Sequence, residues 1–192
     1  MPFGAGLSSD VVPGSPLQVV QFNGTSDAPL RHVGLRNVTL AHAATTFLET
    51  YEVPSGGDWS IVRHGAVFAD GAAQVAIDGC NFDQVDGNGV FFSRFVRNSS
   101  VARNDFYAIG DSAVLMVGAA GQGRIDNSKN REYPAFNVIE GNHVDTNGVW
   151  VRLDIGIRFE PLLTRAMGPT YLLRRPCVPD ADWCLQSMST RC

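Results

Sequence analysis

The amino-acid sequence predicts an all-β fold: a single-stranded right-handed parallel β-helix, which is a solenoid of about four to five rungs, followed by an irregular C-terminal tail. The first observation behind this prediction is a repeated pattern. Ile77–Phe82 and Val101–Phe106 both have the form apolar-x-x-(Asn/Cys)-x-apolar, and the second copy begins 24 residues after the first. A fixed period of this length is typical of solenoids, because each rung packs only on its neighbours.

The same pattern occurs on each side of the central pair. Leu35–Leu40 precedes the first copy by 42 residues, and Ile139–Val144 follows the second by 38 residues. Each of these longer intervals contains a polar insertion, at Val53–Asp58 and at Gly121–Pro134. Solenoids tolerate insertions between rungs, so we expect both segments to be loops, the second of them protruding.

The residue types within the copies favour strands over helices. The apolar runs are short, β-branched or aromatic, and Gly interrupts them. Stacked rungs lie about 4.8 Å apart, so equivalent residues are predicted to form columns along the axis. The predicted columns are two inward apolar ones, Leu35/Ile77/Val101/Ile139 and Leu40/Phe82/Phe106/Val144, and one turn ladder, Cys80/Asn104/Asn142.

The pattern also predicts how the chain is divided. Residues 1–30 are predicted to form an N-terminal loop and a cap strand, and residues 31–156 the β-helix. Residues 157–192 are rich in Arg, Pro and Cys and lack any period, so they are predicted to be a tail outside the solenoid. Cys80 is at a repeat position and is predicted to be a buried thiol. The other three cysteines lack the spacing of metal ligands.

Composition narrows the classes of partner. The chain has 192 residues, 44% hydrophobic and 18% charged, with a net charge of −4. The absence of a basic patch argues against nucleic acid. No apolar run reaches the roughly 18 residues that a membrane-spanning helix requires, so no span is expected.

Two features bear on localisation. Met1–Gly4 lacks the charged region and the apolar core of a signal peptide. Three N-glycosylation sequons are nevertheless present, beginning at Asn23, Asn37 and Asn98, and they give a slight indication of secretion.

Four short strings carry a resemblance to a known family: Thr45–Glu49, Val53–Ser60, Asp86–Gly89 and Ile109–Ala113. They resemble the right-handed parallel β-helix proteins of algae, fungi and invertebrates, which are similar to bacterial β-helical glycoside hydrolases and belong to the pectin-lyase-like superfamily. The resemblance covers roughly Val19–Val151 and implies a secreted or extracellular, glycoside hydrolase-like domain. It implies a polysaccharide or glycan as partner, and neither cofactor nor metal. Members usually continue for many more rungs, so we expect this chain to be a truncated form.

Glycoside hydrolysis requires two carboxyl groups, about 5–5.5 Å apart for retention of configuration and roughly 6.5–9.5 Å for inversion. Equivalent outward residues on adjacent rungs are about 4.8 Å apart, so a solenoid can present either separation. The outward positions are Asn81/Asp105/His143 and Asp83/Tyr107/Asp145, with Asp86 and Asp111 in the turns. Asp111 is the first candidate for a catalytic acid or base because it lies in the more specific family string, and Asp105 and Asp83 are its candidate partners.

Substrate-binding residues are expected at the rim of the groove. The candidates are Glu49, Asp58, Trp59, Arg63 and His64. Trp59 could stack on a sugar or plug the side of the solenoid. Each candidate also has a purely structural interpretation: Asp is favoured in turns by its side-chain hydrogen bonds, and outer-face charges are commonly just solvated.

Two other functions fit the same residues. A polysaccharide lyase or epimerase would use the aspartates to bind a hard cation such as Ca²⁺, with Arg94, Arg97 or Arg103 as the base. The chain could instead be a non-catalytic carbohydrate-binding or structural β-helix fragment. The sequence alone does not choose among the three.

Overall fold

The computed structural model describes residues 18–45, 49, 61–121, 124–125, 132–149, 157–159 and 165–166. Regular structure in these ranges is all β-strand, without a helix. The strands form three parallel sheets and one small antiparallel pair. Within the described ranges there is accordingly no helix long and apolar enough to cross a membrane.

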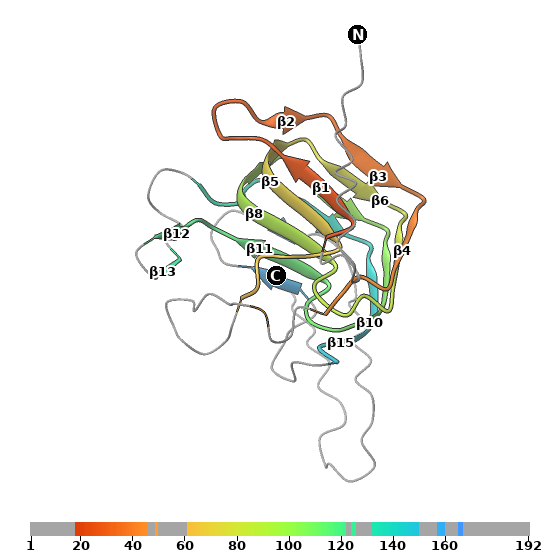
Figure 1. Ribbon diagram of the computed structural model, residues 1–192. Helices are drawn as coiled ribbons and strands as arrows, with labels where there is room; N and C mark the ends of the chain where they lie inside the picture. Colours follow the sequence, from red (N-terminus) through yellow and green to blue (C-terminus); the bar gives the residue numbers. More distant parts are fainter. Residues whose placement is uncertain are drawn as a thin grey trace.

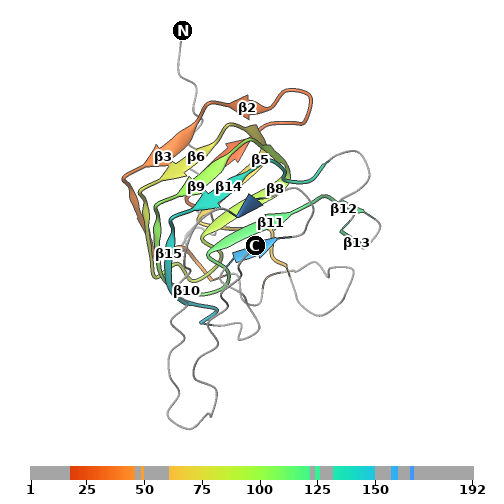
Figure 2. The ribbon, with the colours of Figure 1, turned by 180° about the vertical axis from the view of Figure 1, so that it is seen from behind.

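Sheet A has the strand order β1-β5-β8-β11-β16, with β2 also paired to β5 (Figure 1). Its strands are β1 (Val20–Asn23), β2 (Leu30–Arg31), β5 (Val67–Ala73), β8 (Val90–Arg97), β11 (Val114–Val117) and β16 (Ile157–Phe159). Sheet B has the order β3-β6-β9-β14-β17 (Figure 2). Its strands are β3 (Gly34–Arg36), β6 (Ala76–Asp78), β9 (Ser100–Ala102), β14 (Val138–Glu140) and β17 (Arg165–Ala166).

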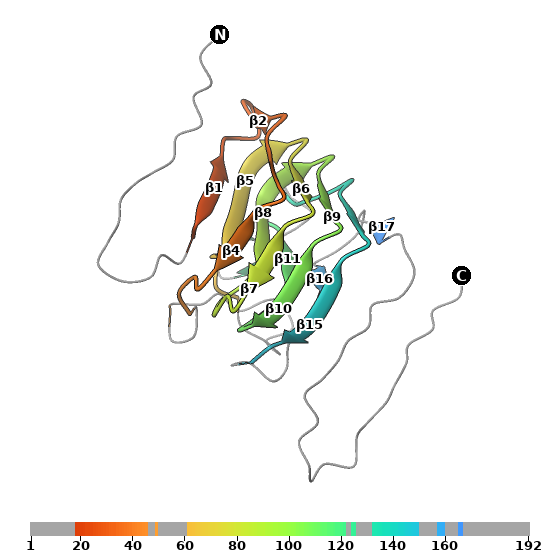
Figure 3. The same cartoon turned by 90° about the vertical axis from the view of Figure 1, so that its right-hand side faces the viewer.

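Sheet C has the order β4-β7-β10-β15 (Figure 3). Its strands are β4 (Thr39–Ala41), β7 (Asn81–Asp83), β10 (Asp105–Ile109) and β15 (His143–Asn147). The antiparallel pair, β12 (Ala120–Gly121) and β13 (Arg124–Ile125), projects from the stack beside β11 (Figure 1). It belongs to the segment that was predicted to protrude.

The chain visits the sheets in a fixed order. One coil runs through β5, β6 and β7, and the next through β8, β9 and β10, giving one strand to each sheet every time (Figure 3). Ile77 pairs with Val101, and Phe82 with Phe106, so the predicted offset of 24 residues is confirmed as the step from one coil to the next. This arrangement is consistent with a parallel β-solenoid.

Both predicted apolar columns lie in register inside the coils. The sheet B column joins Leu35, Ile77, Val101 and Ile139, and the sheet C column joins Leu40, Phe82, Phe106 and Val144. The rings of Phe82 and Phe106 are stacked, with their centroids 4.5 Å apart and their planes 12° apart. Because both rings are fully buried, they contribute strongly to holding successive coils in register.

The predicted turn ladder is confirmed between sheets B and C. The backbone N–H of Cys80 donates to Asn104 Oδ1 at 2.8 Å, and the N–H of Asn104 donates to Asn142 Oδ1 at 2.9 Å. Asn104 Nδ2 also donates to the carbonyl of Ile77 at 3.0 Å. The Cys80 thiol is buried and unoxidised, as predicted. A second ladder, which the sequence pattern did not reveal, links Val75 N–H to Ser99 and Ser99 N–H to Asn137 between sheets A and B.

The corners of the coil are built from residues in the left-handed backbone region. Equivalent positions on successive coils share a positive φ between 49° and 63°. The three columns are His32/Gln74/Asn98/Phe136, Asn37/Gly79/Arg103/Gly141 and His42/Gln84/Ala108/Thr146. Most of these residues are not Gly, so tertiary stacking imposes a backbone conformation that their own preferences disfavour.

The two ends of the chain add strands to the sheets. β1 pairs in parallel with β5 and is the first strand of sheet A. At the other end β16 pairs with β11, and β17 with β14, so short pieces of residues 157–192 extend sheets A and B. The rest of the predicted tail lies outside the described residues.

Candidate functional site

The outer face of sheet C brings together most of the polar residues singled out in the sequence. Asp105 pairs with Asn81 on one side and with His143 on the other. Tyr107 likewise pairs with Asp83 and with Asp145. The two predicted outward columns are therefore real, and they alternate with the buried column of Phe82 and Phe106.

Two of the three predicted catalytic residues, Asp83 and Asp105, are diagonal neighbours on adjacent coils. One strand spacing across and two residues along correspond to about 8 Å between their Cα atoms. The Asp105 side chain is 69% exposed, and its Oδ1 lies 3.4 Å from Nδ1 of His143. Asp83 is half-buried and lies beside Gln84, whose Nε2 is 3.4 Å from Asp83 Oδ1. Both carboxyl groups can reach a ligand from solvent.

Tyr107 lies at the centre of this face. Its side chain is 52% exposed, and its neighbours in the column are Asp83 and Asp145. An exposed aromatic ring with carboxylates on both sides offers a flat apolar surface together with hydrogen-bond acceptors. The alternation along the strand predicts an outward position for Tyr107, which is not among the site residues expected from the sequence.

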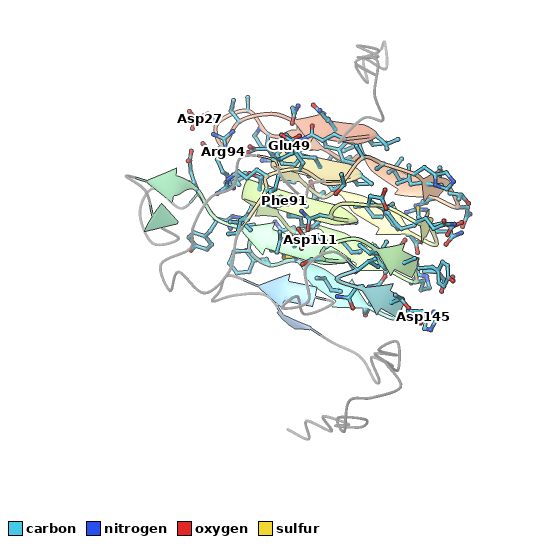
Figure 4. The ribbon with its side chains drawn as sticks, turned by 60° about the horizontal axis from the view of Figure 1, so that its bottom comes forward. Asp27, Glu49, Phe91, Arg94, Asp111 and Asp145 are labelled. Atoms are coloured by element: carbon cyan, nitrogen blue, oxygen red, sulfur yellow. The ribbon has the colours of Figure 1, made fainter. Side chains whose placement is uncertain are left out.

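Asp111, the first candidate for a catalytic group, occupies a different part of the molecule. It lies in the turn after β10, with 9% of its surface exposed. Its N–H donates to the Gly87 carbonyl, and its own carbonyl accepts from Gly148 N–H at 2.9 Å. Asp111 follows Asp105 by six residues and lies beyond the corner at Ala108. Figure 4 shows Asp111 well away from Asp145 at the outer corner of sheet C.

The outer face of sheet A has a contrasting apolar surface. Phe91, Leu115 and Val117 point outward but are buried, and Ile61 packs against them. Phe68 joins this cluster, with its ring centroid 5.7 Å from that of Phe91. These five residues form a second, smaller hydrophobic core outside the coil, which we call the outer cluster.

Two of the predicted substrate-binding residues, Arg63 and His64, closely follow Ile61 of the outer cluster in the sequence. Arg63 donates to Ser93 Oγ at 3.0 Å and to the Gly118 carbonyl at 2.6 Å. His64 Nδ1 lies 2.8 Å from Gln18 Nε2. Arg63 and His64 lie in the loop before β5 of sheet A, whereas Asp83 and Asp105 lie in sheet C, so the structure does not bring the two pairs together.

The remaining predicted rim residues are only partly accounted for. Glu49 is exposed and is labelled in Figure 4. Asp58 and Trp59 lie outside the described residues, so their roles stay predictions. No group of three or more His, Cys, Asp or Glu within the described ranges is arranged to hold a metal ion.

Each arginine that could act as a lyase base already has a partner. Arg94 forms a two-pronged ion pair with Asp70, at 2.7 Å to Oδ2, and its hydrogen bond to this carboxylate raises the pKa of Arg94. Arg103 pairs with Asp78 at 2.6 Å. The guanidinium of Arg97 lies 4.9 Å from the ring centroid of Phe95 and 4.6 Å from that of Tyr133. A raised pKa keeps Arg94 protonated, which is the opposite of what a catalytic base needs.

The described site therefore consists of the exposed face of sheet C, with Tyr107 at its centre and Asp83, Asp105, Asp145 and His143 around it. Comparison of the chain with protein-family models, with curated proteins and with solved structures found no match.

Proposed function

We propose that the chain is a carbohydrate-active domain, a right-handed parallel β-helix of the pectin-lyase-like kind, and that its glycan ligand lies along the outer face of sheet C. The observation that carries this proposal is the position of Tyr107, exposed between Asp83 and Asp145 on neighbouring coils. Right-handedness rests on the general rule that crossover connections between parallel strands of one sheet are right-handed in about 98% of cases.

The chemistry of this face suits a sugar. The apolar face of a pyranose ring can lie on the Tyr107 ring, and its hydroxyl groups can donate to the carboxylates beside it. The coils repeat at one strand spacing, so the columns extend in a line that an extended oligosaccharide can follow.

Hydrolysis is the reaction that the acid pair supports best. The Cα atoms of Asp83 and Asp105 are about 8 Å apart and both side chains leave the same face of the sheet, so their carboxyl groups can take up the separation of roughly 6.5–9.5 Å that inverting glycosidases use. In that mechanism one carboxylic acid protonates the glycosidic oxygen. The other carboxylate removes a proton from a water molecule, which attacks the anomeric carbon from the opposite face. His143 lies next to Asp105 and can orient this carboxyl group.

A non-catalytic carbohydrate-binding solenoid is the second candidate, and one observation favours it. The Asp105 side chain is largely solvated on the flat surface of a sheet, whereas glycosidase acids function in sites that exclude water. Binding without turnover needs only Tyr107 and the hydrogen-bonding groups around it.

The experiment that tests both candidates measures binding and turnover on the same panel of neutral, acidic and basic oligosaccharides. We expect Tyr107→Ala to abolish binding. Asp83→Asn and Asp105→Asn should each abolish release of new reducing ends while leaving affinity within a few-fold of wild type. Asp27→Asn, an exposed carboxylate on the loop before β2, is the control and should change neither quantity. Unchanged glycan binding in Tyr107→Ala would reject the proposed face.

Asp111 stays a separate candidate and needs its own variant. Asp111→Asn keeps much of the turn hydrogen bonding and removes the ionisable group. If Asp111 is catalytic, this variant loses turnover with an unchanged melting temperature, while Asp83→Asn and Asp105→Asn remain active.

A further inference from the structure

The three sequons coincide with asparagines on the surface. The described residues include four exposed asparagines, and three of them, Asn23, Asn37 and Asn98, begin a sequon. None of the other five asparagines in the described part of the chain begins a sequon, and all of them are buried or half-buried: Asn88, Asn104, Asn137, Asn142 and Asn147. An N-glycan requires a surface asparagine, so the fold keeps all three sequons usable.

Asn98 has an unusual neighbour on the next coil. The bridge between Arg97 and Ala135 and the pairing of Ser100 with Val138 place Phe136 in register with Asn98. Both residues have left-handed backbones, with φ of 49° and 58°, at the corner between sheets A and B. Their Cα atoms are therefore about 4.8 Å apart, and their side chains leave the same corner.

Phe136 is anomalous at this position. Its side chain is 57% exposed, although the equivalent corner residues are the polar His32, Gln74 and Asn98. A bulky residue in the left-handed region of backbone conformation is uncommon. An exposed aromatic ring also forgoes the favourable free energy that burial of its apolar surface would contribute. The exposed ring is therefore available to pack against a group attached to the neighbouring corner residue.

We propose that Asn98 carries an N-linked glycan whose first N-acetylglucosamine stacks on the ring of Phe136, and that Asn23 and Asn37 are glycan acceptors on the first coil. The amide nitrogen of Asn98 attacks C1 of the sugar in a lipid-pyrophosphate oligosaccharide donor. The new C–N bond replaces the C–O bond to the diphosphate, which leaves with the electron pair, and the nitrogen loses one proton. The donor and its transferase belong to the secretory pathway, so this proposal requires the chain to enter it.

This inference goes beyond the proposed function and is independent of it. Asn98 is at the corner between sheets A and B, and Asn23 is the last residue of β1 in sheet A. Asn37 is at the corner before β4, two coils from Asp105. None of these three asparagines lies in a strand of sheet C, so glycan occupancy and ligand binding at Tyr107 are measured separately.

Occupancy is tested on protein isolated from the source organism. The protein is treated with a peptide amidase that releases N-glycans in heavy-oxygen water, which converts each glycosylated asparagine to a labelled aspartate. Peptide mass spectrometry should find the label at Asn98, Asn23 and Asn37 and not at the exposed control Asn81, which lacks a sequon. An unlabelled Asn98 in protein from this source would overturn the proposal.

The stacking contact is tested on protein trimmed to the single core sugar. Asn98→Gln supplies the sugar-free reference, and Gln74→Ser is the matched control because Gln74 flanks Asn98 on its other side in the same corner column. We expect the core sugar to raise the melting temperature by about 2 °C in wild type and in Gln74→Ser, and not in Phe136→Ser. Ring-current shifts of the sugar protons should disappear in Phe136→Ser. Equal stabilisation in Phe136→Ser would overturn the stacking.

Discussion

Sheets A and C share the same alternation of inward and outward residues, but their outward residues are buried on sheet A and exposed on sheet C. On sheet A the outward residues Phe91 and Leu115 are as buried as the interior of the coil. On sheet C the outward residues Asp105 and Tyr107 are more than half exposed. The strands differ little in geometry, since both sheets are parallel and follow the same step between coils.

The difference lies in what covers each face. Ile61 packs on Phe91 and Leu115, and Arg63 spans from Ser93 on β8 to Gly118 after β11. Ile61 and Arg63 follow the insertion that interrupts the repeat, so an interruption of the period supplies part of the cover for sheet A. Among the described residues none covers the outer face of sheet C in this way, and that face carries the aromatic and acidic residues, which is why we assign the ligand to sheet C.

The largest expected effect is a difference in the free energy of unfolding between a variant on the outer face of sheet A and one on the outer face of sheet C. Phe91→Ala should lower the free energy of unfolding by about 3–5 kcal/mol, because it leaves a cavity in the outer cluster. Tyr107→Ala should cost less than about 1 kcal/mol, because a half-exposed ring loses few contacts. Denaturant unfolding measures both, and Phe82→Ala inside the coil is the reference for a core cavity. A small effect of Phe91→Ala would show that sheet A is not held by a second core.

A smaller effect compares two arginines. Arg63→Met should cost about 2 kcal/mol, because a charged donor is lost from the Ser93 hydroxyl and the Gly118 carbonyl. Arg103→Met removes an ion pair with Asp78 on an exposed corner and should cost less than about 1 kcal/mol. The Arg103 contribution should also fade in molar salt, whereas that of Arg63 should persist. Equal costs in high salt would contradict the covering role of Arg63.

The smallest effect concerns the rim of sheet A. Asp70→Asn breaks the ion pair with Arg94, whose side chain is half exposed, and should cost at most about 1 kcal/mol. The hydrogen bond to Asp70 raises the pKa of Arg94, so its contribution is fully present below the ordinary arginine pKa and is lost only above the raised value. The difference between Asp70→Asn and wild type should therefore be constant from about pH 6 to about pH 10. Loss of that difference between about pH 6 and about pH 10 would contradict its assignment to the ion pair between Arg94 and Asp70.

Several features of the fold could be predicted from the sequence because they repeat in it. The column of Ile77 and Val101, the stack of Phe82 and Phe106, and the ladder through Asn104 all follow from one pattern read at an offset of 24 residues. The outward positions of Asp83 and Asp105 follow from the same register, since residues alternate between the two faces of a strand.

Other features of the fold depend on tertiary contacts and could not be predicted from the repeat. Residues as different as Arg103, Phe136 and Thr146 adopt left-handed backbones because each corner must match the corner stacked on it. The intrinsic backbone preferences of these residues do not predict this conformation. The burial of Phe91 depends on residues that lie outside its own strand, such as Ile61. A periodic sequence thus determines the contacts between equivalent residues, whereas the conformation of the corners and the exposure of each face depend on non-equivalent residues that only the tertiary structure brings together.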